Sequence, residues 1–253
     1  MQDIKIKDQN PHCSKHVLPA VPSSEVYLED CVTALKRFND NHFDLAIVDP
    51  PYGINADIKN NGKNSDRHEK TSLAKINTYK KTNWDNETPN EDYFNELKRV
   101  SKKQIIWGAN FFGLVGGMLY WHKGVTMPTY STGELAYLSW LQKIDFVNIT
   151  WHGMLQHNMK DKEQRIHPTQ KPVALYDWLL QNYAKEGDLI LDTHAGSMSS
   201  VIACLKGGFN ITAFEIDKEY FEKGKKRVET FLSQGNLFME KQQINFIDTC
   251  SNE

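Results

Sequence analysis

The sequence has little of what marks a secreted, membrane or zinc-binding protein. Its 253 residues include four cysteines, which are widely separated and form no Cys-x-x-Cys pair, so a zinc site or a disulfide framework is not expected. Met1–Ala20 has no apolar segment of the kind found in secretory signals, and no apolar run is long enough to span a bilayer. We therefore expect a cytoplasmic protein that does not enter a membrane.

An excess of positive charge and the glycine-rich nucleotide motifs are also missing. The formal net charge is −2, so any contact with nucleic acid must come from a local basic patch. The chain contains neither Gly-x-Gly-x-x-Gly nor Gly-x-x-x-x-Gly-Lys-Ser/Thr. These absences argue against a nicotinamide oxidoreductase and against a P-loop protein.

What is present is the pattern of one α/β domain. Hydrophobic residues make up 40% of the chain and charged residues 25%, which is ordinary for a globular protein of this length. Short runs rich in Val, Ile and Leu indicate strands buried on both faces, and helical patterns lie between them. This alternation predicts a doubly wound α/β fold. The expected strands are 25–30, 44–48, 104–108, 118–121, 135–140, 146–151, 189–191 and 211–214, and the expected helices are 31–38, 91–100, 172–183, 199–205 and 218–231.

The segment Asp49-Pro50-Pro51-Tyr52 follows one of these strands, at the end where open α/β sheets bind ligands. Its two prolines lack backbone N–H groups, so the turn offers carbonyl oxygens and the Asp49 carboxylate. These acceptors suit an exocyclic base amine, whose lone pair would then point at a sulfonium methyl group. We expect Tyr52 to stack on the base, which must first be flipped out of its duplex. A rigid turn with an aspartate cap is the alternative interpretation.

A second strand end has the pattern of a cofactor site. Asp192 ends a strand, and Gly196 and Ser197 in the following turn would let the backbone approach a ligand closely. Glu215 ends the next strand and can accept hydrogen bonds from two ribose hydroxyls. An ordinary strand-turn-helix unit with a surface acid at the next strand end is the alternative.

Further residues are candidates for the same cofactor. Asp30 ends the first strand and can accept from an adenine amine, although a role as N-cap of the next helix is equally favoured. Within His167–Pro172, Thr169 and Lys171 can hold an amino acid carboxylate by a hydroxyl and a positive charge. His167 itself is equally consistent with a surface loop.

These segments together resemble the N6-adenine/N4-cytosine DNA methyltransferase family, in the β-type order that places the catalytic motif before the cofactor motif. The matching pieces are Asp49–Tyr52 (motif IV), His167–Pro172 (motif X), Leu191–Ser197 (motif I), Glu215–Asp217 (motif II) and Asp30 (motif III). The segments 99–112 and 134–140 are similar to the corresponding sequence of small phage and prophage adenine methylases. The likeness covers about residues 25 to 230.

The resemblance implies a Rossmann-like, mostly parallel, seven-stranded sheet with one antiparallel strand. It also implies S-adenosylmethionine as methyl donor, no metal, and adenine N6 as the target because Asp49 opens motif IV. We expect the methyltransferase domain at residues 25–232, between an N-terminal extension, 1–24, and a C-terminal tail, 233–253. Met198 departs from the family pattern, because it puts bulk where a glycine usually lies near the cofactor.

A basic stretch interrupts the pattern of strands and helices. Residues 55–82 contain seven lysine and arginine residues against three acids, and the short recognition segment 153–166 is also locally basic. We expect both to flank the pocket and grip DNA phosphates, although a solvated loop is the alternative for any single lysine. The candidate DNA-binding residues are Lys63, Arg67, Lys80, Lys81, Lys160 and Arg165.

The residues leave several alternatives open. N4-cytosine DNA methylation, RNA methylation and protein-glutamine methylation use related turns, and Asn rather than Asp is common in the last two. A catalytically degenerate, DNA-binding relic is the non-enzymatic alternative, because Met198 would then exclude the cofactor. DNA is the expected partner, and a homodimer and a cognate restriction enzyme remain open.

Overall fold

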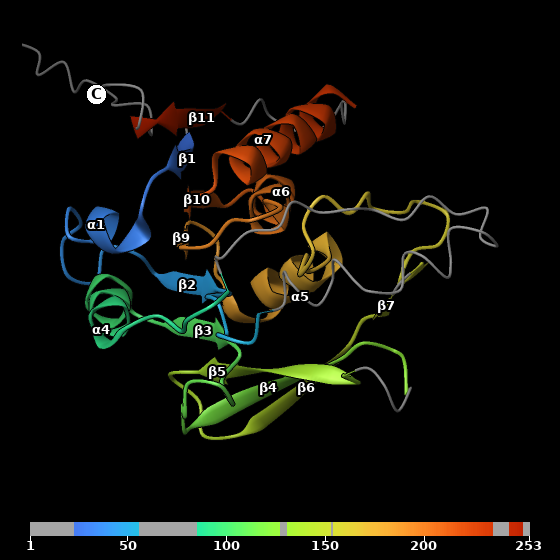
Figure 1. Cartoon of the computed structure of the whole chain (residues 1–253), viewed down its shortest axis with the longest axis horizontal. Coiled ribbons are helices and arrows are strands. Elements are labelled where there is room, and N and C mark those ends of the chain that lie inside the picture. The colour runs from blue at the N-terminus through green and yellow to red at the C-terminus, as the bar shows by residue number, and fades with distance from the viewer. Residues whose placement is uncertain (1–22, 56–84, 127–130, 153, 235–242, 250–253) are drawn as a thin grey trace, which may run out of the picture.

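Nine strands form one sheet in the computed structural model, which describes residues 23–55, 85–126, 131–152, 154–234 and 243–249 (Figure 1). The strand order is β11-β1-β10-β9-β2-β3-β5-β4-β6. The strands are β1 Ser23–Leu28, β2 Leu45–Val48, β3 Gln104–Trp107, β4 Gly117–His122, β5 Gly133–Leu138, β6 Ile144–Asn148, β9 Leu189–Asp192, β10 Asn210–Glu215 and β11 Gln243–Asp248. A separate antiparallel hairpin joins β7, Trp151–His152, to β8, Leu155–Gln156.

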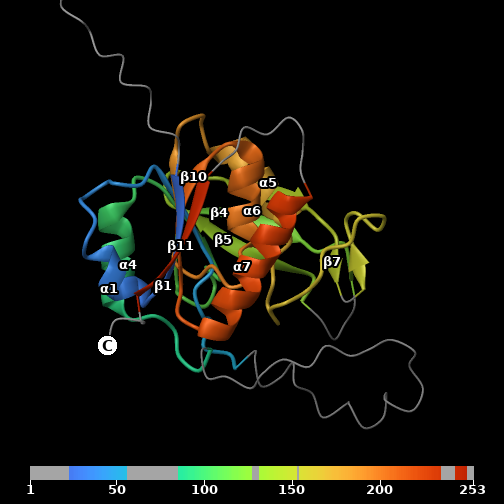
Figure 2. The same ribbon diagram turned by 90° about the horizontal axis from the view of Figure 1, so that it is seen from above.

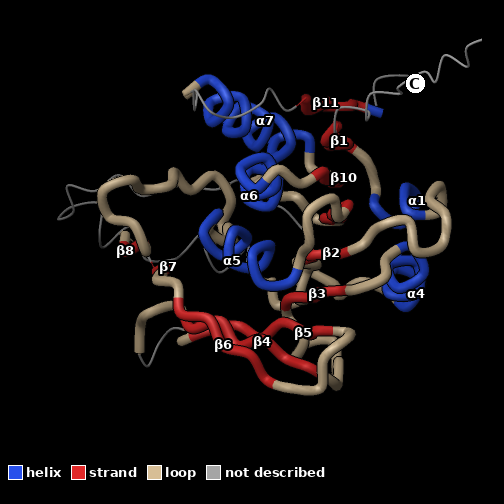
Figure 3. Tube along the Cα trace, turned by 180° about the vertical axis from the view of Figure 1, so that it is seen from behind, coloured by secondary structure: helices blue, strands red, loops and turns tan. Residues whose placement is uncertain are grey.

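The sheet is parallel except at β5, which runs antiparallel to both of its neighbours, β3 and β4. All other neighbouring strands within the sheet pair in parallel. The seven strands from β1 to β4 in the spatial order form the expected mostly parallel sheet with one antiparallel strand. β11 and β6 extend this sheet at its two edges, as Figure 3 shows. The predicted doubly wound α/β fold is confirmed.

Helices cover the sheet in two layers (Figure 2). α5, Val173–Tyr183, α6, Ser199–Gly207, and α7, Lys218–Ser233, lie on one face. α1, Cys31–Leu35, and α4, Glu91–Val100, lie on the other. None of the helices in the described part of the chain is both long and apolar enough to cross a membrane.

The uninterrupted apolar run of β2 follows from these two layers. Leu45 and Ile47 belong to the core cluster that contains the buried side chains of α5, α6 and α7. Ala46 and Val48 belong to the second cluster, with the buried side chains of α1 and α4. Successive strand residues point to opposite faces, so a strand covered on both sides must be apolar at every position.

The C-terminal boundary expected from the sequence is wrong. Residues 243–248, assigned there to a tail, form β11 and pair in parallel with β1 from Ser23↔Gln243 to Leu28↔Asp248. As an edge strand with partly exposed side chains, β11 lacks the continuous apolar pattern that marks the inner strands. The expected strand 146–151 is also divided, into β6 and the start of the β7–β8 hairpin.

The side chain of Met198 does not fill the cofactor turn as the sequence suggested, although its backbone is part of that turn as the N-cap of α6. Its backbone is left-handed, with φ of 58°, and its side chain is fully buried. The side chain contacts α7 at Gly224, where a Cβ atom would lie between 2.7 and 2.9 Å from Met198 Cγ, Sδ and Cε. The missing side chain of Gly224 therefore makes the space that Met198 fills, away from the turn.

The contact between Met198 and Gly224 can be tested by a double-mutant cycle. Gly224→Ala should destabilise the protein by about 1–3 kcal/mol, because the added methyl group overlaps a buried side chain. In a Met198→Gly background the same substitution should be neutral or stabilising, since Ala is favoured over Gly in a helix by about 1 kcal/mol. Denaturant unfolding of the four proteins measures the coupling. Equal effects of Gly224→Ala in both backgrounds would contradict the contact.

Candidate active site

The ends of four neighbouring strands bring the predicted motifs together. Parallel pairing aligns Leu28 of β1 with Glu215 of β10. It also aligns Ala213 of β10 with Asp192 of β9. β2, which ends just before Asp49, is the next strand in the sheet. Because these strands run in the same direction, the turns that follow them meet at one edge of the sheet.

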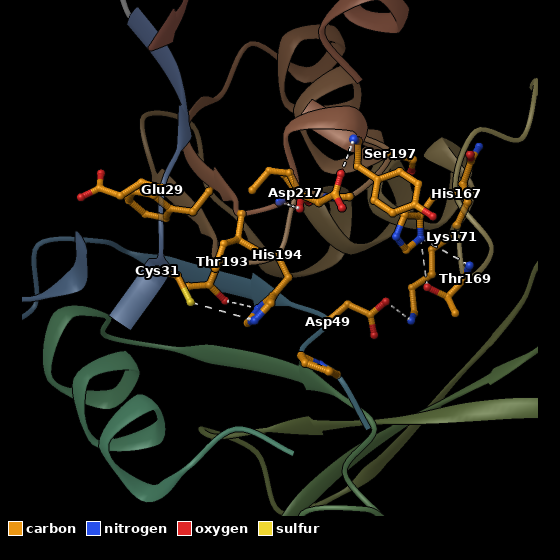
Figure 4. A pocket seen from close by; sticks show the side chains of 18 of the residues that line it. Glu29, Cys31, Asp49, His167, Thr169, Lys171, Thr193, His194, Ser197 and Asp217 are labelled. Atoms are coloured by element: carbon orange, nitrogen blue, oxygen red, sulfur yellow. Dashed lines mark hydrogen bonds and ion pairs between the residues drawn. The ribbon is translucent and has the colours of Figure 1, made fainter. Parts of the chain in front are cut away.

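A cavity of about 310 Å³ lies at this edge (Figure 4). In the figure, Lys171 and Thr169 lie to one side of Asp49, and Cys31 and His194 lie to the other. The residues predicted for the site that line the cavity are Asp30, Asp49, Pro51, Thr169, Lys171, Gly196, Ser197 and Glu215. Catalytic and cofactor candidates from distant parts of the sequence thus share one cavity.

Glu215 is held in the cavity wall by backbone groups. Its Oε2 accepts from the N–H of Gly196 at 2.7 Å, and its Oε1 accepts from the N–H of Asp217 at 2.9 Å. The side chain is almost entirely buried, and this burial raises the pKa of Glu215 to about 7 despite the two N–H donors. The carboxylate is therefore fixed in position and changes charge near neutral pH.

Asp192 is not a lining residue of the cavity. Its Oδ1 accepts from the N–H of His194 at 3.0 Å, and its Oδ2 accepts from the hydroxyl of Ser200 at 2.5 Å. Burial raises the pKa of this carboxyl to about 6. The structure thus places Asp192 behind the turn, where it fixes the shape of the loop between β9 and α6, rather than in direct reach of a ligand.

Asp30 caps α1 and also lines the cavity. Its Oδ1 accepts from the backbone N–H of Thr33 at 2.9 Å and from the Thr33 hydroxyl at 2.8 Å. The capping alternative noted from the sequence is therefore present in the structure. The same carboxyl group lies at the cavity, so the two roles are compatible.

Two histidines in the cavity wall are uncharged at neutral pH. Burial lowers the pKa of His194 to about 4, and its Nδ1 lies 2.9 Å from the Thr193 hydroxyl. Burial also lowers the pKa of His167 to about 3, and its ring packs on Tyr220 with 4.3 Å between centroids. His167 is thus a wall residue and not the surface loop residue that the sequence allowed.

The Asp49–Tyr52 turn is fixed by an acid that the sequence analysis missed. Asp85, which is buried, accepts from the N–H groups of Tyr52 at 2.7 Å and Gly53 at 3.0 Å. The Tyr52 hydroxyl donates to Asp49 Oδ1 at 2.6 Å. The Tyr52 ring stacks on Phe111, with 4.9 Å between centroids and 15° between planes. In this structure Phe111 therefore takes the stacking position for which a base was predicted.

Lys171 lies at the centre of a buried cluster of charges. Its Nζ is 2.5 Å from Asp49 Oδ2 and 3.0 Å from Glu134 Oε2. It also donates to the Tyr52 hydroxyl at 3.2 Å. Lys123 forms a second ion pair with Glu134. Lys171 was predicted to hold a cofactor carboxylate, but its ammonium group is paired with carboxylates of the protein instead.

The cluster changes the pKa values of its members. Burial raises the pKa of Asp49, Lys171 acts against this shift, and the charge of Glu134 adds to it. Burial acts to raise the pKa of Glu134 as well, but Lys171 and Lys123 outweigh it and lower the pKa to about 2. Burial favours the neutral form of Lys171, yet its two carboxylate partners raise its pKa. We therefore treat Glu134 and Lys171 as charged at neutral pH.

A second cavity, of about 450 Å³, lies on the other side of Asp49. Its lining includes Pro50, Tyr52 and two tryptophans, Trp121 and Trp151, neither of which was predicted for the site. The residues that line both cavities are Asp49, Pro51, Thr169, Gln170 and Lys171. The predicted acceptor turn and the HPTQKP segment thus form a wall between two adjacent cavities.

The predicted DNA-binding residues are only partly described. Lys63, Arg67, Lys80 and Lys81 lie outside the described residues. Lys160 is exposed, and Arg165 lies over the ring of Trp151 at 4.3 Å from its centroid, in the lining of the second cavity. Arg165 is thus a wall residue of a cavity, in addition to any contact it makes with phosphates.

No cluster of three or more His, Cys, Asp and Glu side chains in the described part of the chain is arranged to hold a metal ion.

Comparison with known proteins supports the family that the motifs resemble. A family model described as DNA methylase matches residues 120–226. The type II methyltransferase M2.MboI of Moraxella bovis is 24% identical over 245 residues, which cover 80% of this chain and 86% of that relative. The fold is also that of two solved structures. The M1.HpyAVI–SAM complex has a TM-score of 0.51 at 20% identity and covers 81% of this chain and 99% of that one. The PvuII DNA methyltransferase, named as cytosine-N4-specific, has a TM-score of 0.51 at 12% identity, and the match covers 90% of this chain and 95% of that one.

These matches agree with the motifs and with the sheet topology of the chain. The family model and the relatives named as type II methyltransferases support the N6-adenine/N4-cytosine DNA methyltransferase family for this chain.

Proposed function

We propose that the protein transfers the methyl group of S-adenosylmethionine to N6 of an adenine that has been flipped out of duplex DNA. The observation that carries this proposal is the position of Asp49 in the wall shared by the two cavities. A methyl donor in the first cavity and a base in the second would meet at this carboxylate. The proposal thus explains why motifs far apart in the sequence form a single wall.

The first cavity fits the cofactor in size and in chemistry. Its volume of about 310 Å³ lies within the usual range of small-molecule sites. Glu215 provides a fixed carboxylate for ribose hydroxyls, and Asp30 provides an acceptor for the adenine amine. Met198 packs against α7, so its bulk is no obstacle in the turn. The M1.HpyAVI structure of the same fold is named as a complex with SAM. When bound, S-adenosylmethionine supplies an electrophilic methyl group on a positively charged sulfur.

The turn between the cavities suits the amine of the base. The Asp49 carboxylate and the Pro50 carbonyl would accept from the two amine hydrogens, and neither proline offers a competing N–H. Hydrogen bonds to both hydrogens favour a pyramidal nitrogen, so its lone pair is free to point toward the first cavity. In this structure Tyr52 and Lys171 bind the two oxygens of Asp49, and an incoming amine must share or displace one of them.

The choice of adenine rests on Asp49 as the first residue of the turn. N4-cytosine methylation is the alternative, because cytosine presents the same amine beside a ring nitrogen, and a protein of the same fold is named as cytosine-N4-specific. RNA methylation and protein-glutamine methylation are further alternatives, which differ from the proposed DNA methylation in the substrate alone.

The proposed partner is DNA, held in part by the basic residues of the 55–82 segment and by Lys160. The relative from Moraxella bovis is named a type II methyltransferase, and by analogy we propose a cognate restriction enzyme. A cytoplasmic location is part of the proposal, and a homodimer stays an alternative to a monomer.

The modified base is the first test. DNA from cells that express the protein should contain N6-methyladenine within one short sequence motif, detected by nucleoside mass spectrometry and modification-sensitive sequencing. Cells with an empty vector are the control. N4-methylcytosine in place of N6-methyladenine would select the alternative base, and labelled methyl groups in RNA or protein alone would reject the DNA substrate.

The role of Asp49 makes a second prediction. Asp49→Ala should lower the rate of methyl transfer by about a thousandfold or more, since it removes an acceptor from the reacting amine. The affinity for S-adenosylmethionine, measured by calorimetry, should change by no more than a few fold. Lys171 retains Glu134 as its partner in this variant, so the fold should persist. Normal turnover would exclude the assigned role.

Glu215 makes the affinity for the cofactor depend on pH. Its pKa in the unliganded protein is raised to about 7, and ribose hydroxyls donate to the ionised form. The affinity for S-adenosylmethionine should therefore increase as the pH rises through about 7, and fall by roughly tenfold per pH unit below it. Glu215→Gln should bind more weakly and lose this part of the pH dependence. Calorimetry of both proteins across this range is the measurement, and parallel pH profiles would contradict the assignment.

A further inference from the structure

Two carboxylates and two ammonium groups meet at the second cavity, where Asp49 and Lys171 belong to the wall between the cavities and Glu134 and Lys123 line the second cavity alone, yet the proposed reaction uses only Asp49. Lys171 bridges Asp49 and Glu134, and Lys123 pairs with the same Glu134. Lys171 is 5% exposed, so its ammonium group is largely shielded from water, while the side chains of Asp49, Glu134 and Lys123 are partly buried. Lys123 lies outside the segments that carry the family resemblance, and Glu134 opens the segment 134–140, for which no role was predicted.

The position of Glu134 is set by the sheet rather than by a loop. It lies on the antiparallel strand β5, directly opposite Trp121 of β4. Lys123 immediately follows β4 and reaches back to the Glu134 carboxylate. The Tyr52 hydroxyl, 3.4 Å from Glu134 Oε2, is also within reach of both carboxylates. Glu134 is therefore a rigidly placed second partner for Lys171.

A lysine beside Asp49 is a problem for the proposed chemistry. Its ammonium group competes with the base amine for the carboxylate oxygens. It also repels the positive charge that develops on the amine nitrogen when the methyl group is transferred, and such repulsion is strong in a site with little water. A lysine paired with Asp49 alone would therefore weaken the acceptor on which catalysis depends.

We propose that Glu134 is a positioning residue for methyl transfer: its carboxylate holds the ammonium group of Lys171, so that Asp49 stays available as acceptor for the base amine. The inference rests on the proposed function. In the cluster, Asp49 and Glu134 balance Lys171 and Lys123. Loss of the Glu134 charge leaves an excess positive charge beside the reacting amine and leaves Lys171 with Asp49 as its one carboxylate partner among the contacts described.

The test is Glu134→Gln, which keeps the size of the side chain and removes its charge. The variant should lower kcat on DNA by on the order of 10- to 100-fold. The affinity for S-adenosylmethionine should change by less than about threefold, because Glu134 is not a lining residue of the first cavity. Asp177→Asn is the matched control, because it removes the carboxylate of an ion pair between α5 and Lys206 of α6, outside both cavities, and should leave kcat unchanged.

The pH profile of kcat separates positioning from a structural defect. Asp49 must be ionised to accept from the amine, so kcat falls as the pH drops through the pKa of Asp49. The charge of Glu134 raises that pKa. Glu134→Gln should therefore shift the acidic limb of the kcat–pH curve to lower pH by about one unit, while the maximum kcat on the plateau falls. Saturating S-adenosylmethionine keeps the titration of Glu215 out of the measurement.

The groups that face the cluster are Lys171, Lys123 of the β4–β5 connection, Tyr52, Tyr93 of α4, Tyr176 of α5 and Asp192 of β9.

A charge-restored variant gives an independent readout. Lys123→Met combined with Glu134→Gln removes one charge of each sign, so the remaining pair of Asp49 and Lys171 is neutral again. We expect kcat of the double variant to recover at least about fivefold relative to Glu134→Gln. Glu134→Asp, which keeps the charge on a shorter side chain, should retain more activity than Glu134→Gln.

The outcomes distinguish this inference from the proposed function. If the wild-type protein methylates no DNA, the proposed function fails. If it does, normal kcat in Glu134→Gln overturns the positioning role, and so does a loss of kcat with an unshifted acidic limb and no recovery in the double variant. Should Glu134→Gln fail to fold, the double variant and Glu134→Asp carry the comparison. The inference is then rejected if the double variant, which has no carboxylate at position 134 to hold Lys171, has the kcat of the wild type.

Discussion

The ion pair between Lys171 and Asp49, shared with Glu134, is the interaction on which the rest of the site depends. Lys171 precedes α5, Asp49 follows β2 and Glu134 lies in β5, so one ammonium group joins three parts of the chain. Buried charges are costly unless each has a partner in good geometry, and removal of one leaves the others uncompensated. The three segments must therefore assemble together, and their assembly brings the second cavity against the first. The stability of the wall and its chemistry thus come from the same side chains.

Carboxylates also shape the turns around this wall. Asp85 holds the backbone of the Asp49–Tyr52 turn, Asp192 holds the turn after β9, and Glu215 ties that turn to the one after β10. A carboxylate that accepts two hydrogen bonds fixes the positions of two donors, as packing fixes apolar side chains in a core. Burial raises the pKa of Asp192 and Glu215 toward neutrality, so these acceptors are less firmly ionised than surface acids. The loops at this edge of the sheet are thus ordered by buried carboxylates that accept backbone hydrogen bonds.

The parts of this structure that could be predicted from the sequence are local. The inner strands and the helices follow from apolar runs and helical spacing, and Asp49, Gly196 and Glu215 follow from their positions at strand ends. Glu134 and Asp85 could not be found in this way, because each acts on a residue more than thirty positions away through contacts that only the folded sheet creates. Trp121 and Trp151 were assigned to strands, but nothing local indicates that they line a cavity. The prediction that Met198 adds bulk beside the cofactor was wrong, because the side chain packs against Gly224 of α7, a contact that the local sequence does not show.

The order of the strands has a consequence for folding during synthesis. β1, the first strand to be synthesised, lies between β10 and β11, which are the last two. Both edges of β1 lack their partners until residues 210–215 and 243–248 have been synthesised, and contacts that join distant parts of a sequence form slowly. Asp30, at the end of the short loop after β1, reaches its place beside Glu215 only in that late step. The cavity proposed for the cofactor is therefore completed only after β10 has paired with β1, in a late step of folding.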